Sequence, residues 1–242
     1  MIIYGTGKWA KLIGAKLADC GITPCYIGSD SAVATYHKNW PVSNIFKGST
    51  VLIASATKDH YRDLEYSLKL KPSKIFIEKG FSNQEEKEKA KKLIGNVPTY
   101  FLSQYRYSNA IGTVVNLQTP ITSCRYVWNI DSGLISEWAY HILSIDNYLK
   151  KANNRLYIHE PGEYDIDQIS SISIQWSNER SLSIELETDQ HNIHIDLGKN
   201  NKVSIKNKQT DDIFNLEYEQ EDCLEKQIKD VINSDTTILE RL

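Results

Sequence analysis

The feature that most constrains this chain is a glycine turn at its start. Residues 1–4, "MIIY", form a short apolar run that predicts a buried strand, and the run leads directly into Gly-x-Gly-x-x-Ala at residues 5–10. Apolar residues then recur at helical spacing, and Gly21 is placed to end the helix. A strand, this turn and a helix in that order predict the start of a Rossmann unit.

Each small residue of the turn has its own physical role. Gly5 allows the tight turn, Gly7 leaves room for a pyrophosphate near the backbone, and Ala10 lets the helix pack close to the strand. The phosphates would rest on the unpaired amides and positive dipole end of the helix. The residues expected to bind a dinucleotide here are Gly5, Thr6, Gly7, Lys8, Trp9 and Ala10. The alternative is a glycine turn that binds no ligand.

The first hundred residues alternate between strand and helix patterns, whereas the rest do not. Strands are predicted at 23–28, 49–56, 74–80 and 98–106, and helices at 8–21, 60–71 and 83–95. This alternation predicts a parallel sheet with right-handed crossovers. Later, helices are predicted at 134–152 and 218–233, and strictly alternating apolar residues at 172–176, 182–186, 193–197 and 203–205.

The alternating segments predict an antiparallel or mixed sheet with one covered face and one open face. The expected fold class is therefore α/β, with a Rossmann dinucleotide-binding domain at 1–108 followed by a smaller α+β domain at 109–242 whose open sheet is mostly antiparallel. A second copy packed on the open face would cover it, so we expect a homodimer through this C-terminal sheet.

Composition excludes several function classes. The net charge is −3 with 24% charged residues and no long single-sign run, so neither nucleic acid nor a membrane surface is the expected partner. No apolar run approaches the roughly 18 residues of a membrane helix, and no basic leader precedes the first strand. Four cysteines without metal-ligand spacing predict reduced thiols in a cytoplasmic protein and no metal site.

The end of the second predicted strand bears on the choice of dinucleotide. An enzyme that uses NAD usually has an acid there, but Ser29 stands at the likely strand end and Asp30 comes slightly late. The missing acid and the hydroxyls of Ser29 and Ser31 favour NADP(H), with NAD(H) as the alternative. Lys8 and Lys38 are the candidate cations for a 2′-phosphate.

Five segments in a fixed order carry a family resemblance. They are "GTGKWA" at 5–10, "ASATKDHY" at 54–61, "FIEKG" at 76–80, "SQYR" at 103–106 and a Gly-x-x-x-acid-x-x-x-His helix at 133–141. The order and spacing of these segments resemble those of the Gfo/Idh/MocA family of glucose-fructose oxidoreductase and inositol dehydrogenase. The resemblance covers nearly the whole length of the chain.

The resemblance implies a catalytic role for Lys79. In the family, a Glu-Lys-Pro segment sits against the nicotinamide, and its lysine helps proton transfer or holds the substrate oxygen. Here Glu78 and Lys79 match, but Gly80 replaces the proline, which puts the family's usual cis peptide in doubt. The alternative for Lys79 is a surface lysine at a strand end.

The resemblance also implies an acid/base pair on the long helix. The family has Asp and His four residues apart, and this chain has Glu137 and His141. That spacing puts both side chains on one helical face. His141 would be the main acid/base, and Glu137 would orient the substrate or tune the histidine. The alternative for His141 is a histidine satisfied within a helix packed on the sheet.

Further site residues follow from the matched segments. Thr57 and Glu78 are expected to contact the cofactor, and His60 is either near the cofactor or a helix cap. Gln104 and Arg106 are expected at the substrate, with a structural role as the alternative for Arg106.

These expectations describe an NAD(P)-dependent oxidoreductase that passes a hydride between nicotinamide and a small molecule, with a sugar, cyclitol or nucleotide sugar as the expected substrate. One alternative is reduction of a conjugated or ring-stacking substrate, as in bilin and imine reductases. A second is a non-catalytic dinucleotide sensor. A third is a structural dimer whose turn binds nothing.

Overall fold

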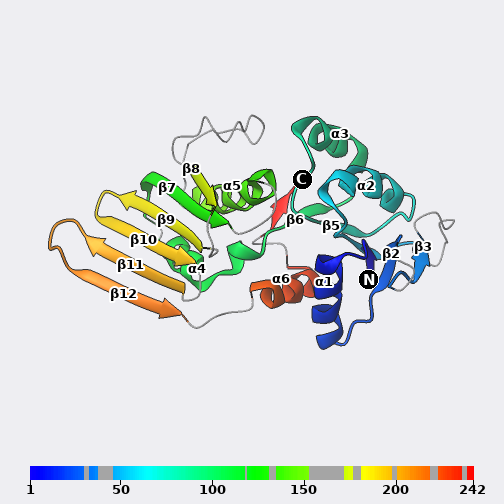
Figure 1. Ribbon diagram of the computed structural model, residues 1–242, viewed down its shortest axis with the longest axis horizontal. Helices are drawn as coiled ribbons and strands as arrows, with labels where there is room; N and C mark the ends of the chain where they lie inside the picture. Colours follow the sequence, from blue (N-terminus) through cyan, green and yellow to red (C-terminus); the bar gives the residue numbers. More distant parts are fainter. Residues whose placement is uncertain are drawn as a thin grey trace. The chain divides into compact units, whose positions relative to one another are not determined.

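The computed structural model describes residues 1–29, 33–37, 46–117, 119–130, 135–152, 172–176, 181–197, 201–218, 223–235 and 239–242 (Figure 1). The chain forms two compact units. The first comprises Met1–Ser103 and Leu224–Leu242, and the second comprises Gln104–Cys223. The C-terminal segment therefore returns to the unit in which the chain began.

The sheet of the first unit has the strand order β13-β6-β5-β4-β1-β2-β3. Its strands are β1 (Ile2–Tyr4), β2 (Cys25–Gly28), β3 (Tyr36–His37), β4 (Thr50–Ile53), β5 (Lys74–Glu78), β6 (Thr99–Leu102) and β13 (Glu240–Arg241). Neighbours from β3 to β6 pair in parallel, and β13 pairs antiparallel with β6. The order from β3 to β6 is that of a Rossmann fold, as the sequence predicts.

Apolar runs and helix ends explain the local structure of this unit. Consecutive residues of β1, β4 and β5 are buried, as expected for parallel strands covered on both faces. The helices are α1 (Lys8–Asp19), α2 (His60–Leu68), α3 (Gln84–Ile94) and α6 (Cys223–Asn233), with a 3₁₀ turn η2 at Thr57–Asp59. Gly21 follows α1 with a φ of +78°, and the amides of Gly21 and Ile22 donate to Ala18 and Leu17, which caps the helix end as predicted.

The second unit is an open sheet with helices on one face. Its strand order is β12-β11-β10-β9-β7-β8, and every pair except β7–β8 is antiparallel. The strands are β7 (Ile121–Ile130), β8 (Ile172–Trp176), β9 (Ser181–Thr188), β10 (His191–Leu197), β11 (Asn201–Asn207) and β12 (Ile213–Tyr218). The remaining elements are η3 (Gln104–Tyr107), α4 (Asn109–Asn116) and α5 (Ile135–Ala152). The expected fold class is thus confirmed for both units.

Strand alternation divides the second sheet into a buried face and an open face. Leu182, Ile184 and Leu186 of β9 are buried and join α4 and α5 in one core cluster. Glu185 and Glu187 alternate with these buried residues and are exposed on the open face, where Nη1 of Arg125 lies 3.6 Å from Oε2 of Glu185. The predicted alternation is therefore correct, and the open face is polar.

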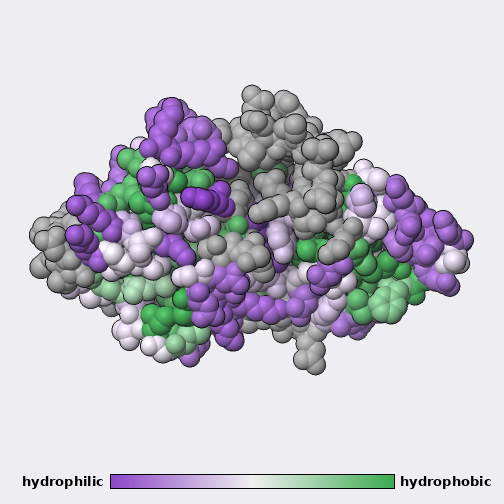
Figure 2. All heavy atoms as spheres, turned by 180° about the vertical axis from the view of Figure 1, so that it is seen from behind, coloured by the Kyte–Doolittle hydropathy of each residue, from purple (hydrophilic) through white to green (hydrophobic). Residues whose placement is uncertain are grey.

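Figure 2 shows hydrophilic side chains gathered at the tip of the β11–β12 hairpin, at the right edge of the view. Close to this tip, Ile213 and Phe214 of β12 are each 60% exposed.

None of the described helices is long and apolar enough to cross a membrane.

Three features of the fold differ from the sequence expectation. The predicted closing helix begins too early, because Tyr218 pairs with Asn201 in the sheet and α6 starts at Cys223. The helix α4 and the strands β7 and β12 were not expected. The division into units also differs at the C-terminus. There Leu224, Ile228 and Val231 of α6 are buried, and Glu240 of β13 pairs with Phe101 of β6.

Candidate dinucleotide site

The glycine turn brings the ends of two strands into close contact. Gly5 has a φ of +122°, which L side chains rarely adopt, and its amide donates to the carbonyl of Ile27 at 2.9 Å. A Cβ built on Gly5 would lie 2.6 Å from the carbonyl oxygen of Ala54, just after β4. Both conformation and space therefore require glycine. The helix packs as closely as predicted, since Ala10 is fully buried.

Gly7 lies immediately before α1, next to open space. Its φ is −72°, and a Cβ built on it meets no described atom within 4 Å. The first turn of α1 has no acidic side chain, and the first amides of a helix have no acceptor inside it. The start of α1 therefore presents amide groups and the positive end of the helix dipole to an open space that fits a diphosphate.

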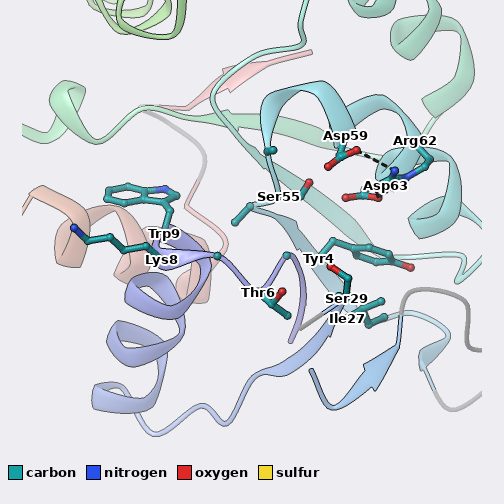
Figure 3. A pocket seen from close by; sticks show the side chains of 15 residues that line it. Tyr4, Thr6, Lys8, Trp9, Ile27, Ser29, Ser55, Asp59, Arg62 and Asp63 are labelled. Carbon is teal, nitrogen blue, oxygen red and sulfur yellow. Dashed lines mark hydrogen bonds and ion pairs between the residues drawn. The ribbon is translucent and has the colours of Figure 1, made fainter. Parts of the chain in front are cut away.

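A cleft of about 360 Å³ opens over this turn (Figure 3). The residues that line it are Tyr4, Gly5, Thr6, Gly7, Lys8, Trp9, Ile27, Gly28, Ser29, Ala54, Ser55, Ala56, Asp59, Arg62 and Asp63. They come from the carboxyl ends of β1, β2 and β4 and from the starts of α1 and α2. The strand order reverses between β1 and β4, and such switch points are where open α/β sheets bind ligands.

The structure brings part of the expected cofactor set into this cleft. Its lining contains Gly5, Thr6, Gly7, Lys8, Trp9 and Ser29 but not Ala10, Thr57, His60 or Glu78. Sequence reasoning missed Ser55, whose hydroxyl oxygen is buried and makes no hydrogen bond to the described residues. Buried polar atoms are almost always paired, so a bound group in the cleft would supply the partner.

The end of β2 lies against the turn. A Cβ built on Gly28 would lie 2.4 Å from Cγ2 of Thr6, so glycine leaves the room that Thr6 occupies. Ser29 follows and lines the cleft, as the sequence analysis expected. The other residues weighed for dinucleotide choice lie outside the described residues: Asp30, Ser31 and Lys38.

Three charged side chains from η2 and α2 line the same cleft and were not predicted. Nη1 of Arg62 lies 2.9 Å from Oδ1 of Asp59, and its Nη2 and Nε donate to Oδ1 of Asp63 at 3.0 and 3.2 Å. Burial, and then the charge of Asp63, raise the pKa of Tyr4, which lines the cleft beside them. Asp59 and Arg62 are three residues apart at the start of a predicted helix, and this spacing was the signal in the sequence.

His60 bridges two loops that follow neighbouring strands. The side chain is fully buried, with Nδ1 2.7 Å from the carbonyl oxygen of Gly80 and Nε2 3.0 Å from that of Ser55. A neutral imidazole has one N–H and donates to one of these carbonyls at a time. Burial lowers the pKa of His60, against the opposing effect of the two hydrogen bonds. The two contacts join the loops after β4 and β5 and cap no helix, and a place near the cofactor stays a prediction for His60.

Lys79 follows β5 in a strained conformation. Its φ is +61°, and a non-glycine residue held there costs on the order of 1 to 3 kcal/mol, a strain that concentrates at functional sites. Its Nζ lies 4.0 Å from Oε1 of the buried Glu78. The described segments contain no cis peptide bond, so the bond before Gly80 is trans.

Comparison with known proteins identifies the fold. No protein-family model and no curated protein matches the sequence. Among solved structures, UDP-N-acetylglucosamine 3-dehydrogenase GnnA from Acidithiobacillus ferrooxidans matches with a TM-score of 0.71 and 13% identity, over 96% of this chain and 87% of that one. The 3-ketoreductase KijD10 from Actinomadura kijaniata, in complex with NADP and TDP-benzene, matches with a TM-score of 0.65 and 9% identity, over 98% and 89%.

A third match is the super-repressor mutant of Gal80p from Saccharomyces cerevisiae, with a TM-score of 0.68 and 12% identity over 96% of this chain and 83% of that one. The chain has the two-domain fold of Gfo/Idh/MocA-type dehydrogenases. Enzymes and a repressor thus share the Gfo/Idh/MocA fold with this chain.

In this Gfo/Idh/MocA fold, the residues expected at the substrate belong to the second unit. Gln104 opens η3. Arg106 is buried, its Nε donates to Oγ of Ser144 at 2.8 Å, and its guanidinium lies 5.6 Å from the centre of the Tyr148 ring. These contacts connect η3 to α5, and the substrate role expected for Gln104 and Arg106 stays a prediction.

His141 lies on α5 among aromatic side chains. It is buried, and its ring centre is 5.1 Å from that of Tyr105 and 5.9 Å from that of Trp128. Glu137 is also on α5, but its side chain is outside what the structure describes. The catalytic roles expected for both in the Gfo/Idh/MocA resemblance stay predictions. Among the described residues, no group of three metal-ligating side chains comes together.

Proposed function

We propose that this protein is an NAD(P)-dependent oxidoreductase. The observation that carries the proposal is the cleft above the start of α1, where Gly5 is fixed by strand packing and Gly7 leaves the backbone open. The proteins that share the fold support it, since GnnA is titled a dehydrogenase and KijD10 a ketoreductase in complex with NADP.

The chain's own residues fit a dinucleotide. The first amides of α1 would hold the diphosphate, Ser29 would face the ribose near the end of β2, and the hydroxyl of Ser55 would gain its missing partner. The bound nicotinamide supplies the hydride donor or acceptor. NADP(H) is our preferred form, because the described residue that follows β2 in the cleft is Ser29 and not an acid.

The protein's chemical task is then to position the substrate and move a proton. Oxidation of an alcohol removes a hydride from carbon and a proton from oxygen, and Lys79 or His141 would take that proton. The strained backbone at Lys79 supports a functional role, because the fold maintains this conformation at a cost. Glu137 would orient the substrate or tune His141.

A sugar, cyclitol or nucleotide sugar is the proposed substrate class. GnnA acts on a nucleotide sugar by its title, and another protein of this fold, levoglucosan dehydrogenase, was solved with L-sorbose. We also propose a cytoplasmic homodimer through the second sheet. The open face of its described strands carries exposed charged side chains such as Arg125 and Glu185, so the dimer contact should weaken with salt. None of the four cysteines forms a disulfide.

The second candidate function is a dinucleotide-binding sensor without turnover. It is favoured by one specific observation, namely that a repressor mutant, Gal80p, has this fold. Both functions require dinucleotide binding, and only the enzyme requires Lys79 to act on a substrate.

The experiment that tests the proposal is a thermal-shift titration with NAD, NADH, NADP and NADPH. A ligand at 100 times its dissociation constant adds about 2.7 kcal/mol to the free energy of unfolding, which gives a clear rise in Tm. A flat response to all four overturns the enzyme and the sensor together. If any of them raises Tm, sugars and nucleotide sugars are then screened as substrates, with the absorbance of the reduced nicotinamide as the measure of turnover. Turnover in that screen separates the enzyme from the sensor.

A further inference from the structure

The charged residues of the cleft lie on two sides of the glycine turn. Figure 3 shows Arg62, with Asp59 and Asp63, on the same side as Ser29, the residue after β2, whereas the side chain of Lys8 points to the opposite side. A cation near the end of β2 was missing from the sequence analysis, which considered Lys8 and Lys38. Arg62 supplies one from a different element, the helix after β4.

The end of β2 is where a Rossmann fold distinguishes its two dinucleotides. An acid at this point binds the 2′-hydroxyl of the adenosine ribose, and an arginine nearby accommodates a 2′-phosphate instead. In this chain Ser29 stands there, and Arg62 lines the same cleft.

The guanidinium of Arg62 has donors left for a phosphate. A guanidinium carries five N–H groups. Nη1 uses one toward Asp59, and Nη2 and Nε use one each toward Asp63, so one N–H remains on each terminal nitrogen. The side chain is 43% exposed, which leaves it open to a ligand. Two donors on one planar group match the spacing of phosphate oxygens.

The two carboxylates hold Arg62 in place. Asp63 is nearly buried, with 9% of its side chain exposed, and it takes two of the three contacts. A side chain fixed before binding loses less conformational entropy when the ligand arrives. Asp59 is more exposed, at 30%, and competes with a phosphate for Nη1. Removing its charge should therefore strengthen phosphate binding.

We propose that Arg62 is the receptor for the 2′-phosphate of NADP(H), positioned by Asp63 and moderated by Asp59. The inference rests on the proposed dinucleotide function and assigns the residue that determines which dinucleotide is preferred. It places the specificity determinant on α2 and not on the loop after β2.

Calorimetric titration of NADPH and NADH into the wild-type protein and Arg62→Gln tests this assignment. We expect the variant to bind NADPH about tenfold more weakly or worse, because a charge-assisted contact is lost, and NADH within about twofold of the wild type. Asp59→Asn should bind NADPH more tightly than the wild type, with NADH unchanged. Arg125→Gln on the second sheet, which removes an exposed arginine paired with Glu185, is the matched control and should alter neither constant.

The outcomes separate this inference from the proposed function. If the wild type binds neither dinucleotide, both fail. If it binds them but Arg62→Gln weakens both equally, or neither, the function stands and the assignment of Arg62 is overturned. The assignment also fails if Lys8→Gln, and not Arg62→Gln, removes the preference for NADPH. Should Arg62→Gln not fold, Arg62→Lys and Asp59→Asn decide, since an unchanged ratio of the two constants in both contradicts the proposal.

Discussion

The two units of this molecule carry their candidate functional residues in opposite ways. In the first unit, the cleft is shaped by backbone, with Gly5 and Gly28 at positions where a Cβ would collide and Gly7 where it would meet open space. In the second unit, Arg106 and His141 are each 6% exposed and lie among side chains of their own core. The comparison suggests a difference in how substitutions act. In a site formed by backbone, a substitution can impair binding without disturbing the core, whereas in a site formed by buried side chains the same residues also stabilise the fold.

The strongest test of this contrast is Gly5→Ala. The new methyl would lie 2.6 Å from the carbonyl oxygen of Ala54, at a φ of +122°. We expect a loss of roughly 2 to 6 kcal/mol in the free energy of unfolding, from strain and overpacking together. Urea unfolding measures it. A loss below about 1 kcal/mol would show that the strand ends separate easily, and the turn would then not be fixed by packing.

Lys79→Met asks whether the strained lysine is chemical or structural. If Lys79 moves a proton, turnover on the true substrate should fall by at least about 10²-fold, while dinucleotide affinity stays within about twofold. The measurements are kcat and a dinucleotide titration. Unchanged kcat would remove Lys79 from the mechanism and leave its strained backbone a structural feature.

His141→Phe separates core from chemistry in the second unit. Phenylalanine keeps an aromatic ring against Tyr105 and Trp128, so the free energy of unfolding should change by less than about 1.5 kcal/mol, as for other near-isosteric core changes. An acid/base role predicts a fall in kcat of about 10² in the same protein. Full activity in a stable variant would make His141 a packing residue alone.

Gly7→Ala should affect binding and leave folding intact. Its φ of −72° suits alanine, and a Cβ there meets no described atom within 4 Å, so Tm should change by no more than a few degrees. The methyl would occupy the space assigned to the diphosphate and weaken the dinucleotide by about tenfold or more. Equal dissociation constants for both proteins would mean that the diphosphate lies elsewhere. With Gly5→Ala, this variant shows whether packing and binding are separate functions of one turn.

The smallest expected effect is a pH dependence of stability from His60. Burial lowers the pKa of His60 in the folded state, and the charge of Lys79 lowers it further. Hydrogen bonds to the carbonyls of Gly80 and Ser55 and the charge of Asp63 act in the opposite direction. The unfolded chain therefore binds more protons below about pH 6.5, so stability should fall as pH drops through that value. Thermal unfolding between pH 5 and 8 should show a shallower acid loss in His60→Gln than in the wild type. An identical loss in both would assign the dependence to other groups.

The fold of the first unit was largely readable because its determinants are local. Apolar runs mark strands buried on both faces, and the turn needs glycine whatever lies around it. The helix α4 was missed since its residues, "NAIGTVVN", contain glycine and β-branched side chains that disfavour a helix until Ala110, Ile111 and Val114 are buried. Strand β7 was missed because polar residues interrupt its apolar pattern. Its antiparallel hydrogen bonding to β9 stabilises the strand, and that pairing is not visible in the sequence of β7 alone.

The candidate site shows the same limit. Residues of the turn could be predicted because backbone geometry dictates them. The role of His60 could not, since it depends on Gly80, a residue twenty positions later that only the pairing of β4 with β5 brings near. Arg62 was overlooked because cations were sought near the second strand, and a helix after the fourth reaches the same cleft.

The return of the C-terminus to the first sheet has a consequence for biosynthesis. The strand β6 receives its neighbour β13 from the last residues of the chain, and α6 buries Leu224, Ile228 and Val231 in the same unit. During translation, β6 therefore leaves the ribosome before β13, and its edge lacks this partner while the second unit is made. An open strand edge can pair with other chains, so nascent chains translated from one mRNA can aggregate until β13 has been made.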